Sequence, residues 1–369
     1  MASVLDTRSL NRATLARQLL LSRAALSAEE AVAHLLGLQA QNVKPPYFQL
    51  HARLAGFRPA ALAELMESRK VVRMVTMRST IHTHTAHDAL TLRPLVQAAR
   101  DREVNAFRKG LVGVDPERLG EVARAFVEAE PRTMGEIREE LLGHWPDADP
   151  QSLSVAARCR LPLVQVTPRG VWGRSGQVRL TTLEQWIGGP AAGAAAPQGD
   201  VGDIDDVVLR YLGAFGPASV KDMQTWAGLT RLREAFERLR PRLDVFRDEN
   251  GVELFDLPDA PRPDAGTPAP PRFLPEFDNL LLSHADRSRV IAPELKGRTW
   301  TGNQSHRTLL VDGFVAGLWH WEEASLTVEL FGKVSKAEKE HIVVEGERVI
   351  TEMAESGGPR RVRFGSIHG

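Results

Sequence analysis

The sequence predicts an α+β fold in which three tandem winged-helix domains precede a β-rich C-terminal region. Three observations lead to this class. Helical segments followed by two short segments rich in β-branched residues occur three times along the 369 residues. Two of these groups begin with the same capping motif, which indicates an internal repeat. Strand patterns dominate after a proline-rich linker. Helices followed by a strand pair are the plan of a winged helix.

The first winged-helix domain is expected at residues 1–112. Apolar residues at helical spacing predict its first helices at residues 8–22, 28–38, 46–56 and 59–68. The segment at residues 71–84 is rich in β-branched side chains and predicts a pair of strands. A long helix at residues 86–109 is expected to close the domain.

The second domain, with its linker, is expected at residues 113–199, and the third at residues 200–260. In the second, helices at 116–129, from 131 onward and at 152–161 precede a hairpin of residues 163–166 and 171–173, and a Gly/Ala/Pro-rich linker runs over residues 188–199. In the third, helices at 204–215, from 217 onward and at 229–239 precede strands at 243–246 and 252–255. Asn250-Gly251 is the turn signal between those strands.

The second helix opens in the same way in both domains. Thr133 is followed three residues later by Glu136, and Ser219 is followed three residues later by Asp222. A hydroxyl cap with an acid at this spacing predicts a capping box at the start of a helix. The repeat therefore lies at the level of a supersecondary unit.

The remaining residues, 261–369, are expected to hold a proline-rich linker and a β-rich C-terminal domain. Strand patterns occur at residues 308–311, 314–319, 325–331 and 362–364. One helix is predicted at residues 335–356.

The composition is that of a cytoplasmic globular protein. Lysine plus arginine equals aspartate plus glutamate at 47 each, which argues against nucleic-acid binding by bulk charge alone. Eight of these 47 basic residues are lysines, and an arginine-rich set suits phosphate contacts or simply reflects GC-rich codons. The single Cys159 excludes an internal disulfide and a multi-cysteine zinc site. The chain shows no apolar run long enough to span a membrane and no signal peptide.

Two glutamines stand out where the second helix is expected to stop. Gln39 and Gln41 are separated by Ala40, and the pair Pro45-Pro46 follows. Proline pushes the residue before it out of the α region. On an extended segment, residues two apart face the same side, so two neutral amides would lie together. From the residues alone, the favoured role of these glutamines is to cap a helix end through backbone hydrogen bonds.

Three winged helices in tandem can build one long concave surface, and duplex DNA is the commonest partner of such a surface. His82 and His84 share a face of the expected strand, with His87 close by, but no further acidic or histidine cluster accompanies them. A structural or DNA-contacting role therefore outweighs a metal site, and no metal or cofactor is expected. No phosphate-binding loop or dinucleotide fingerprint is present.

Four motifs, in their order and spacing, carry a resemblance to a known family. They are Leu38-Gln39-Ala40-Gln41 with Pro45-Pro46-Tyr47, Arg78-Ser79-Thr80-Ile81-His82, Phe273-Leu274-Pro275-Glu276-Phe277-Asp278-Asn279-Leu280-Leu281 with His284-Ala285-Asp286-Arg287, and Val311-Asp312-Gly313-Phe314-Val315-Ala316-Gly317-Leu318-Trp319. Over nearly its whole length, the chain resembles the bacterial winged-helix DNA glycosylases of the AlkZ type.

The resemblance implies that Gln39 and Gln41 are catalytic, because a Gln-x-Gln or Gln-x-Asp pair has that role in the family. Ala40 departs mildly from the bulkier apolar residue usual between them. The Gln form is similar to the branch that excises bulky N7-alkylpurines and can unhook interstrand crosslinks, often as self-resistance in producers of DNA-alkylating compounds. The implied partner is double-stranded DNA carrying alkylated purines, bound by a cytoplasmic, nucleoid-associated monomer.

Such chemistry is compatible with amides. An N7- or N3-alkylated purine is already cationic and leaves without protonation, so the general acid of ordinary glycoside hydrolysis is not needed. Amide carbonyls can orient a water and stabilise the developing sugar cation. A crosslinked base cannot be flipped fully out, so a shallow, open site is expected. We expect DNA contacts from Arg78, His82, Arg287, Arg298 and His306. The alternatives are a non-catalytic winged-helix DNA-binding regulator and a protein-interaction scaffold.

Overall fold

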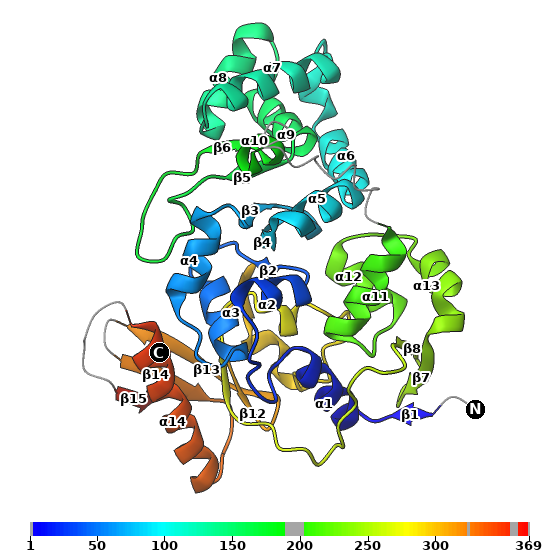
Figure 1. The fold of residues 1–369 in the computed structure, drawn as a ribbon, viewed down its shortest axis with the longest axis vertical. Helices are drawn as coiled ribbons and strands as arrows, with labels where there is room; N and C mark the ends of the chain where they lie inside the picture. The colour runs from blue at the N-terminus through cyan, green and yellow to red at the C-terminus, as the bar shows by residue number, and fades with distance from the viewer. Residues whose placement is uncertain (1–2, 189–202, 323–324, 355–360, 368–369) are drawn as a thin grey trace.

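The computed structural model describes residues 3–188, 203–322, 325–354 and 361–367, and the mixed α+β class is confirmed (Figure 1). Three helical units and a β-rich part make up the molecule. The predicted linker at residues 188–199 lies almost entirely outside the described residues. Among the described residues, 3-10 turns lie at Met77–Ser79, Arg108–Leu111, Arg240–Arg242, Asn279–Leu281 and Pro293–Arg298.

The first unit packs helices around two long antiparallel strands. Its helices are α1 (Thr7–Arg17), α2 (Ala28–His34), α3 (Pro45–Arg53), α4 (Pro59–Glu67), α5 (Ala86–Leu95) and α6 (Gln97–Ala106), and its strands are β2 (Leu38–Gln39), β3 (Val71–Val75) and β4 (Ile81–Thr85). β3 pairs with β4 in antiparallel register, as predicted. The single long helix expected at residues 86–109 is wrong, because the chain breaks into α5 and α6 around Val96. Pro94 removes a backbone donor there and crowds the preceding turn.

The second unit contributes strands to the same sheet as the first. Its elements are α7 (Pro116–Ala129), α8 (Met134–His144), α9 (Pro150–Arg160), β5 (Leu163–Gln165), β6 (Leu180–Thr182) and α10 (Leu183–Ile187). The strand order is β2-β4-β3-β5-β6, so this sheet crosses the domain boundary expected after residue 112. The predicted hairpin of residues 163–166 with 171–173 is wrong. β5 pairs with β6 and β3, while Trp172 packs on Tyr47 with ring centroids 4.9 Å apart.

The third unit follows the plan expected for residues 200–260 in its element order. It comprises α11 (Ile204–Phe215), α12 (Val220–Ala227), α13 (Arg233–Leu239), β7 (Asp244–Asp248) and β8 (Glu253–Asp256), with the N-terminal β1 (Val4–Leu5) added parallel to β7. The capping boxes of Thr133 with Glu136 and of Ser219 with Asp222 are both present, which confirms the matching helix starts.

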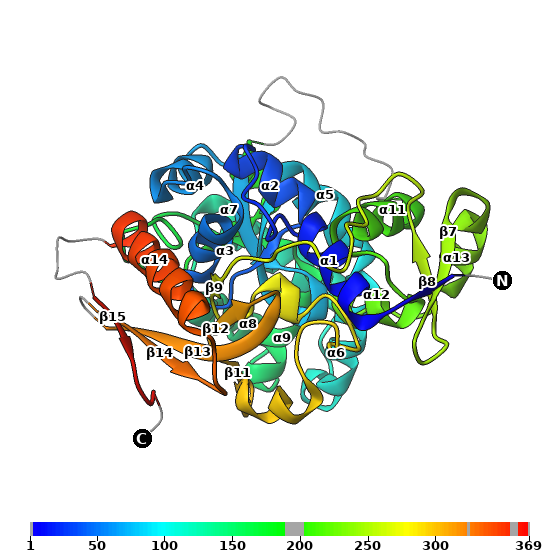
Figure 2. The same cartoon turned by 90° about the horizontal axis from the view of Figure 1, so that it is seen from below.

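The C-terminal part is a five-stranded sheet covered by a long helix. Its elements are β9 (Arg272–Leu274), β10 (Trp300–Thr301), β11 (Gln304–Ser305), β12 (Thr308–Val311), β13 (Phe314–Glu322), β14 (Ser325–Leu330), α14 (Lys336–Met353) and β15 (Arg361–Phe364). The strand order β15-β14-β13-β12-β9 leaves the short β10–β11 hairpin outside the sheet. α14 lies along this sheet and buries Ile342, Val349 and Ile350 (Figure 2).

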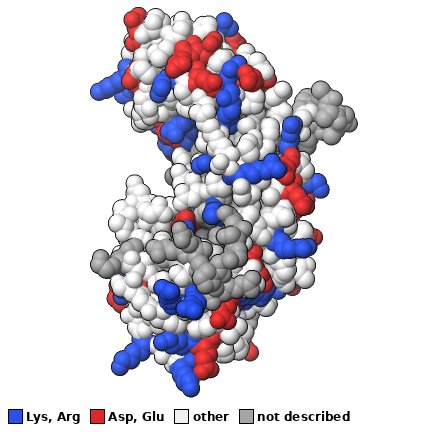
Figure 3. Space-filling model, turned by 90° about the vertical axis from the view of Figure 1, so that its left-hand side faces the viewer, with Lys and Arg blue, Asp and Glu red and all other residues white. Residues whose placement is uncertain are grey.

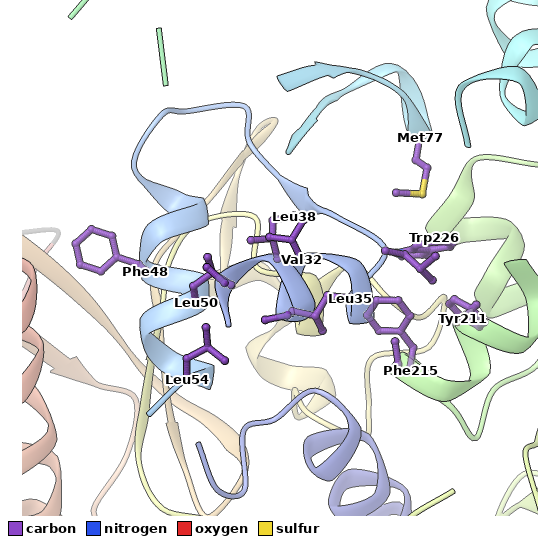
Figure 4. Packing of buried hydrophobic residues seen from close by; sticks show 14 of the residues in the cluster. Val32, Leu35, Leu38, Phe48, Leu50, Leu54, Met77, Tyr211, Phe215 and Trp226 are labelled. Carbon is purple, nitrogen blue, oxygen red and sulfur yellow. The ribbon is translucent and has the colours of Figure 1, made fainter. Parts of the chain in front are cut away.

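One apolar core ties the first and third units together. Val32 and Leu35 of α2 lie in the same buried cluster as Tyr211 and Phe215 of α11 and Trp226 of α12 (Figure 4). The second unit has a separate core between α7, α8 and α9. The segment that follows α2 is therefore anchored on a rigid base that also carries α11 and α12.

Candidate active site

The chain leaves α2 earlier than expected and turns sharply. The helix predicted to reach residue 38 ends at His34, because Leu36 and Gly37 adopt φ angles of 54° and 95°. Such angles suit glycine. A Cβ at Gly37 would also overlap the imidazole of His84, so the turn needs a residue without a side chain.

Gln39 follows this turn on the short strand β2, and Gln41 begins a bend of residues 41–44. Gln39 pairs opposite His82 in the antiparallel β2–β4 ladder, and the Ala40 amide continues the pairing by donating to the Ile81 oxygen at 2.7 Å. Alternate residues of an extended segment face the same side. The extended geometry holds for Gln39, whereas Gln41 lies in a bend of residues 41–44 with its side chain exposed, so a shared face for the two amides stays a prediction.

Buried side chains hold the backbone of this segment in place. Gln49 Nε2 donates to the Gln39 oxygen at 3.1 Å, and Arg73 Nη2 donates to the Ala40 oxygen at 3.0 Å. Gln49 and Arg73 are both buried. Buried donors therefore fix the backbone carbonyl groups of Gln39 and Ala40.

A buried ion pair stabilises the residues that make these contacts. Arg53 and Asp278 form two hydrogen bonds of 2.8 and 2.7 Å, and both side chains are fully buried. Arg53 also donates to the backbone oxygen of Gln49 at 3.0 Å, while Asn279 donates to that of Gly37 at 2.9 Å. Sequence reasoning quoted Asp278 and Asn279 only as parts of a motif. Two acidic residues, Glu276 and Asp278, within a largely apolar run were the available signal.

The Gln39 side chain is bound by Arg78. Arg78 Nη2 donates to Gln39 Oε1 at 2.6 Å, and Nη1 donates to the Trp226 oxygen in the last turn of α12. The Arg78 backbone has φ 53°, and a Cβ on Gly228 would come within 3.0 Å of the Arg78 nitrogen. Arg78 consequently links the glutamine pair to the third unit at a point of close backbone approach.

His82 is a neutral imidazole beside this arginine. Its Nδ1 donates to the Thr80 oxygen at 3.0 Å, which leaves Nε2 to face Arg78 Nη2 at 3.4 Å. Burial, followed by the charge of Arg78, holds the pKa of His82 well below its usual value. Burial also lowers the pKa of Arg78 to about 10. Both residues were predicted to contact DNA, and both have their polar groups engaged within the protein.

Gln41 is the exposed member of the pair, and a carboxylate lies near it. Gln41 Oε1 is 3.5 Å from the Ile81 amide nitrogen. The next residue, Asn42, donates to Glu276 Oε1 at 3.2 Å, and Arg307 Nε donates to Glu276 Oε2 at 2.9 Å. Sequence reasoning assigned no role to Glu276 or Arg307, because 234 positions separate Asn42 from Glu276.

The other predicted DNA contacts lie in the C-terminal part. Arg287 is half-buried and donates to a backbone carbonyl at 3.4 Å. Arg298 pairs with Glu329 at 3.0 Å, and His306 Nε2 lies 2.9 Å from Thr301 Oγ1 at the base of the β10–β11 hairpin. These bonds join the three side chains to neighbours in the C-terminal part, and their contact with DNA stays a prediction.

Among residues that the structure describes, no group of three or more histidine, cysteine or acidic side chains is placed to hold a metal ion. None of the described helices combines the length and apolar character needed to cross a membrane.

The glutamine pair and the mixed α+β fold together indicate one class of proteins. The chain belongs to the AlkZ-like DNA glycosylase family, whose model matches residues 32–351. That match includes both glutamines and most of the C-terminal sheet.

Among individual proteins, the chain is 23% identical to the interstrand DNA cross-link repair glycosylase of Streptomyces sahachiroi. The alignment spans 371 residues and covers 94% of this chain and 96% of the relative. The solved structure of the Streptomyces sahachiroi DNA glycosylase AlkZ is similar with a TM-score of 0.80 and 20% identity, covering 98% of this chain and 100% of that one. At this identity, the likeness shows a shared fold.

Proposed function

We propose that this protein is a monofunctional DNA glycosylase that hydrolyses the N-glycosidic bond of cationic N7- or N3-alkylated purines in duplex DNA. One observation carries the proposal. Gln39 and Gln41 lie two residues apart on a segment in which the backbone oxygens of Gln39 and Ala40 are held by buried donors. A positioned pair of amides suits a reaction whose leaving group is already cationic, because the leaving base needs no proton.

The surroundings of Gln39 and Gln41 differ, which supports different roles for the two side chains. Gln41 is exposed and lies beside Asn42, so it is the member placed to meet a lesion. Glu276 adds a carboxylate to this edge of the site through Asn42. A carboxylate held by Asn42 and Arg307 can stabilise positive charge on the sugar without acting as a proton donor.

The architecture supports duplex binding. Three helical units occur where the sequence predicts three winged helices. Figure 3 shows the surface notched between the upper lobe, where Figure 1 places α7 and α8, and the lower half of the molecule. We propose that a DNA duplex lies along this notch, bound by a monomer. Contacts to the phosphates would come from Arg287, Arg298 and His306, which position the duplex without reading its sequence.

Crosslink unhooking is the finer part of the proposal. The Streptomyces sahachiroi relative is named as an interstrand cross-link repair glycosylase, and the alignment covers nearly the whole of both chains. An exposed Gln41 fits the shallow site that a base tethered to both strands requires. Self-resistance to a DNA-alkylating compound is the biological role that we propose.

The proposal is tested with duplexes carrying N7-methylguanine, N3-methyladenine or an interstrand crosslink. The expected products are abasic sites with intact strands, and an opened crosslink. Substitution of Gln39 or Gln41 by alanine should lower the rate of base release at least about tenfold, or about 1.4 kcal/mol. DNA binding without release of any base would instead support a non-catalytic regulator.

A further inference from the structure

The hydrogen bonds of Gln39 determine which end of its amide faces outward. A guanidinium only donates, so the Gln39 atom 2.6 Å from Arg78 Nη2 must be the carbonyl oxygen. The bonds that the described residues make to Gln39 reach this Oε1 and the backbone oxygen. Its Nε2 is therefore left for a group outside the protein.

We infer that Gln39 acts on DNA as a hydrogen-bond donor through Nε2, and that Arg78 is the positioning residue that fixes this orientation. The acceptor role then falls to Gln41. The inference rests on the proposed glycosylase function and deepens it, because it gives the two glutamines of one site opposite hydrogen-bonding roles.

The charge of Arg78 supports this division. An oxygen that accepts from a guanidinium at 2.6 Å is already polarised toward a positive charge. The same charge disfavours a second cation nearby, such as the developing oxocarbenium ion. Gln39 Oε1 is thus a poor stabiliser of that cation, whereas Gln41 Oε1 has only a marginal contact of 3.5 Å with the Ile81 amide.

The setting of Arg78 indicates a function beyond stability. Arg53 is buried with a carboxylate partner, Asp278. Arg78 is buried with neutral acceptors instead, namely the Trp226 oxygen, Gln39 Oε1 and His82 Nε2, and no carboxylate pairs with it among the described residues. A buried charge without a counter-charge on a left-handed backbone is destabilising, and such features concentrate at functional sites.

The chain contains a matched control for this arrangement. Arg93 also joins a backbone oxygen, that of Cys159 at 2.7 Å, to a glutamine carbonyl, Gln97 Oε1 at 2.6 Å. Burial lowers the pKa of Arg93 to about 10, as it does for Arg78. Arg93 and Gln97 lie in α5 and α6, outside the glutamine segment. They reproduce the contact between a buried arginine and a glutamine carbonyl, but Gln97 Nε2 is already bonded to Asp101 Oδ1 at 2.6 Å, so Gln97 has no donor left for DNA.

The first experiment measures single-turnover release of N7-methylguanine by the full-length Gln39→Glu and Gln97→Glu variants. A carboxylate keeps the contact with arginine but cannot donate. Gln39→Glu should therefore lose at least about tenfold in rate, the loss also expected of Gln39→Ala, while Gln97→Glu should stay within about twofold of the wild type. A Gln39→Glu rate equal to or above that of the wild type would overturn the donor role.

The second experiment asks whether Arg78 acts through Gln39. Arg78→Met should lower the rate about tenfold, whereas Arg93→Met should alter stability similarly and leave the rate unchanged. In the double variant Arg78→Met/Gln39→Ala, the rate should match that of Gln39→Ala alone. Losses that multiply would show that Arg78 does not work through the amide.

A readout without catalysis separates this inference from the proposed function. In protein labelled with 15N-glutamine, the Gln39 side-chain amide signal is assigned by its loss in Gln39→Ala. A duplex that cannot be cleaved should shift this signal. A wild type that releases no base refutes the proposed function alone, whereas an unshifted Gln39 amide with bound duplex refutes the donor role.

Discussion

At the scale of single residues, the glutamine segment depends on a buried ion pair. Arg53 and Asp278 are fully buried and connect α3 to the loop after β9. Asp278→Ala should lower the free energy of unfolding by about 3–5 kcal/mol, because it leaves the Arg53 charge unpaired. The double variant Arg53→Met/Asp278→Leu should lose less than Asp278→Ala. Urea denaturation measures both, and a loss below about 1 kcal/mol in Asp278→Ala would contradict this role.

A residue-scale prediction was possible where the signal was contiguous. Gln39 and Gln41 could be singled out because their spacing and the prolines after them occupy one short stretch. Their partners could not be found in this way. Arg78 was predicted to touch DNA, but a turn with φ 53° directs it to Gln39 and Trp226. The direction of the Arg78 side chain depends on how the third unit packs against the first. No local sequence pattern predicts this packing.

At the scale of elements, the turn between α2 and β2 sets the exit direction of the glutamine segment. Gly37→Ala should be more destabilising than Gly56→Ala by about 1–3 kcal/mol, because only the first overlaps a side chain. Both glycines have positive φ angles, 95° and 64°, so Gly56→Ala carries the backbone penalty alone.

Thermal or urea unfolding of the two glycine variants gives the comparison, and base release by Gly37→Ala should fall as the segment shifts. Equal stability of the two variants would show that the imidazole of His84 moves to make room for the new methyl group at little cost in free energy.

Element prediction was accurate for helices with local start signals and weaker for sheets. The capping boxes at Thr133 and Ser219 were predicted from four residues each and are present. The partner of β5 was predicted to be the next β-like segment, but β5 pairs with β3 and β6. Strand pairing joins segments that are far apart in sequence. Val171 and Trp172 do not form a strand with β5, because Val171 lies in the apolar core and Trp172 packs against it.

At the scale of the whole molecule, buried neutral histidines make stability depend on pH. Burial lowers the pKa of His84 to about 4 and that of His51 to about 3, against about 6.5 in an unfolded chain. Between these values the unfolded chain binds protons that the folded chain does not. The free energy of unfolding should therefore decrease as the pH falls below about 6.5. This decrease should end once the pH reaches the pKa values of the folded protein.

Each of these imidazoles contributes up to about 1.4 kcal/mol per pH unit in that window. Urea denaturation at about pH 7.5, 6 and 5 measures the effect. His84→Gln should flatten the dependence. Equal stability of the wild type at all three pH values would contradict the neutral burial of these histidines.

The central claim is that the Gln39–Gln41 pair releases alkylated purines from DNA. The most direct measurement is single-turnover release of N7-methylguanine from a duplex by the wild type, Gln39→Ala and Gln41→Ala. The account predicts abasic sites from the wild type and a loss of at least about tenfold in each variant. Release by both variants at the wild-type rate, or no release by the wild type, would contradict it.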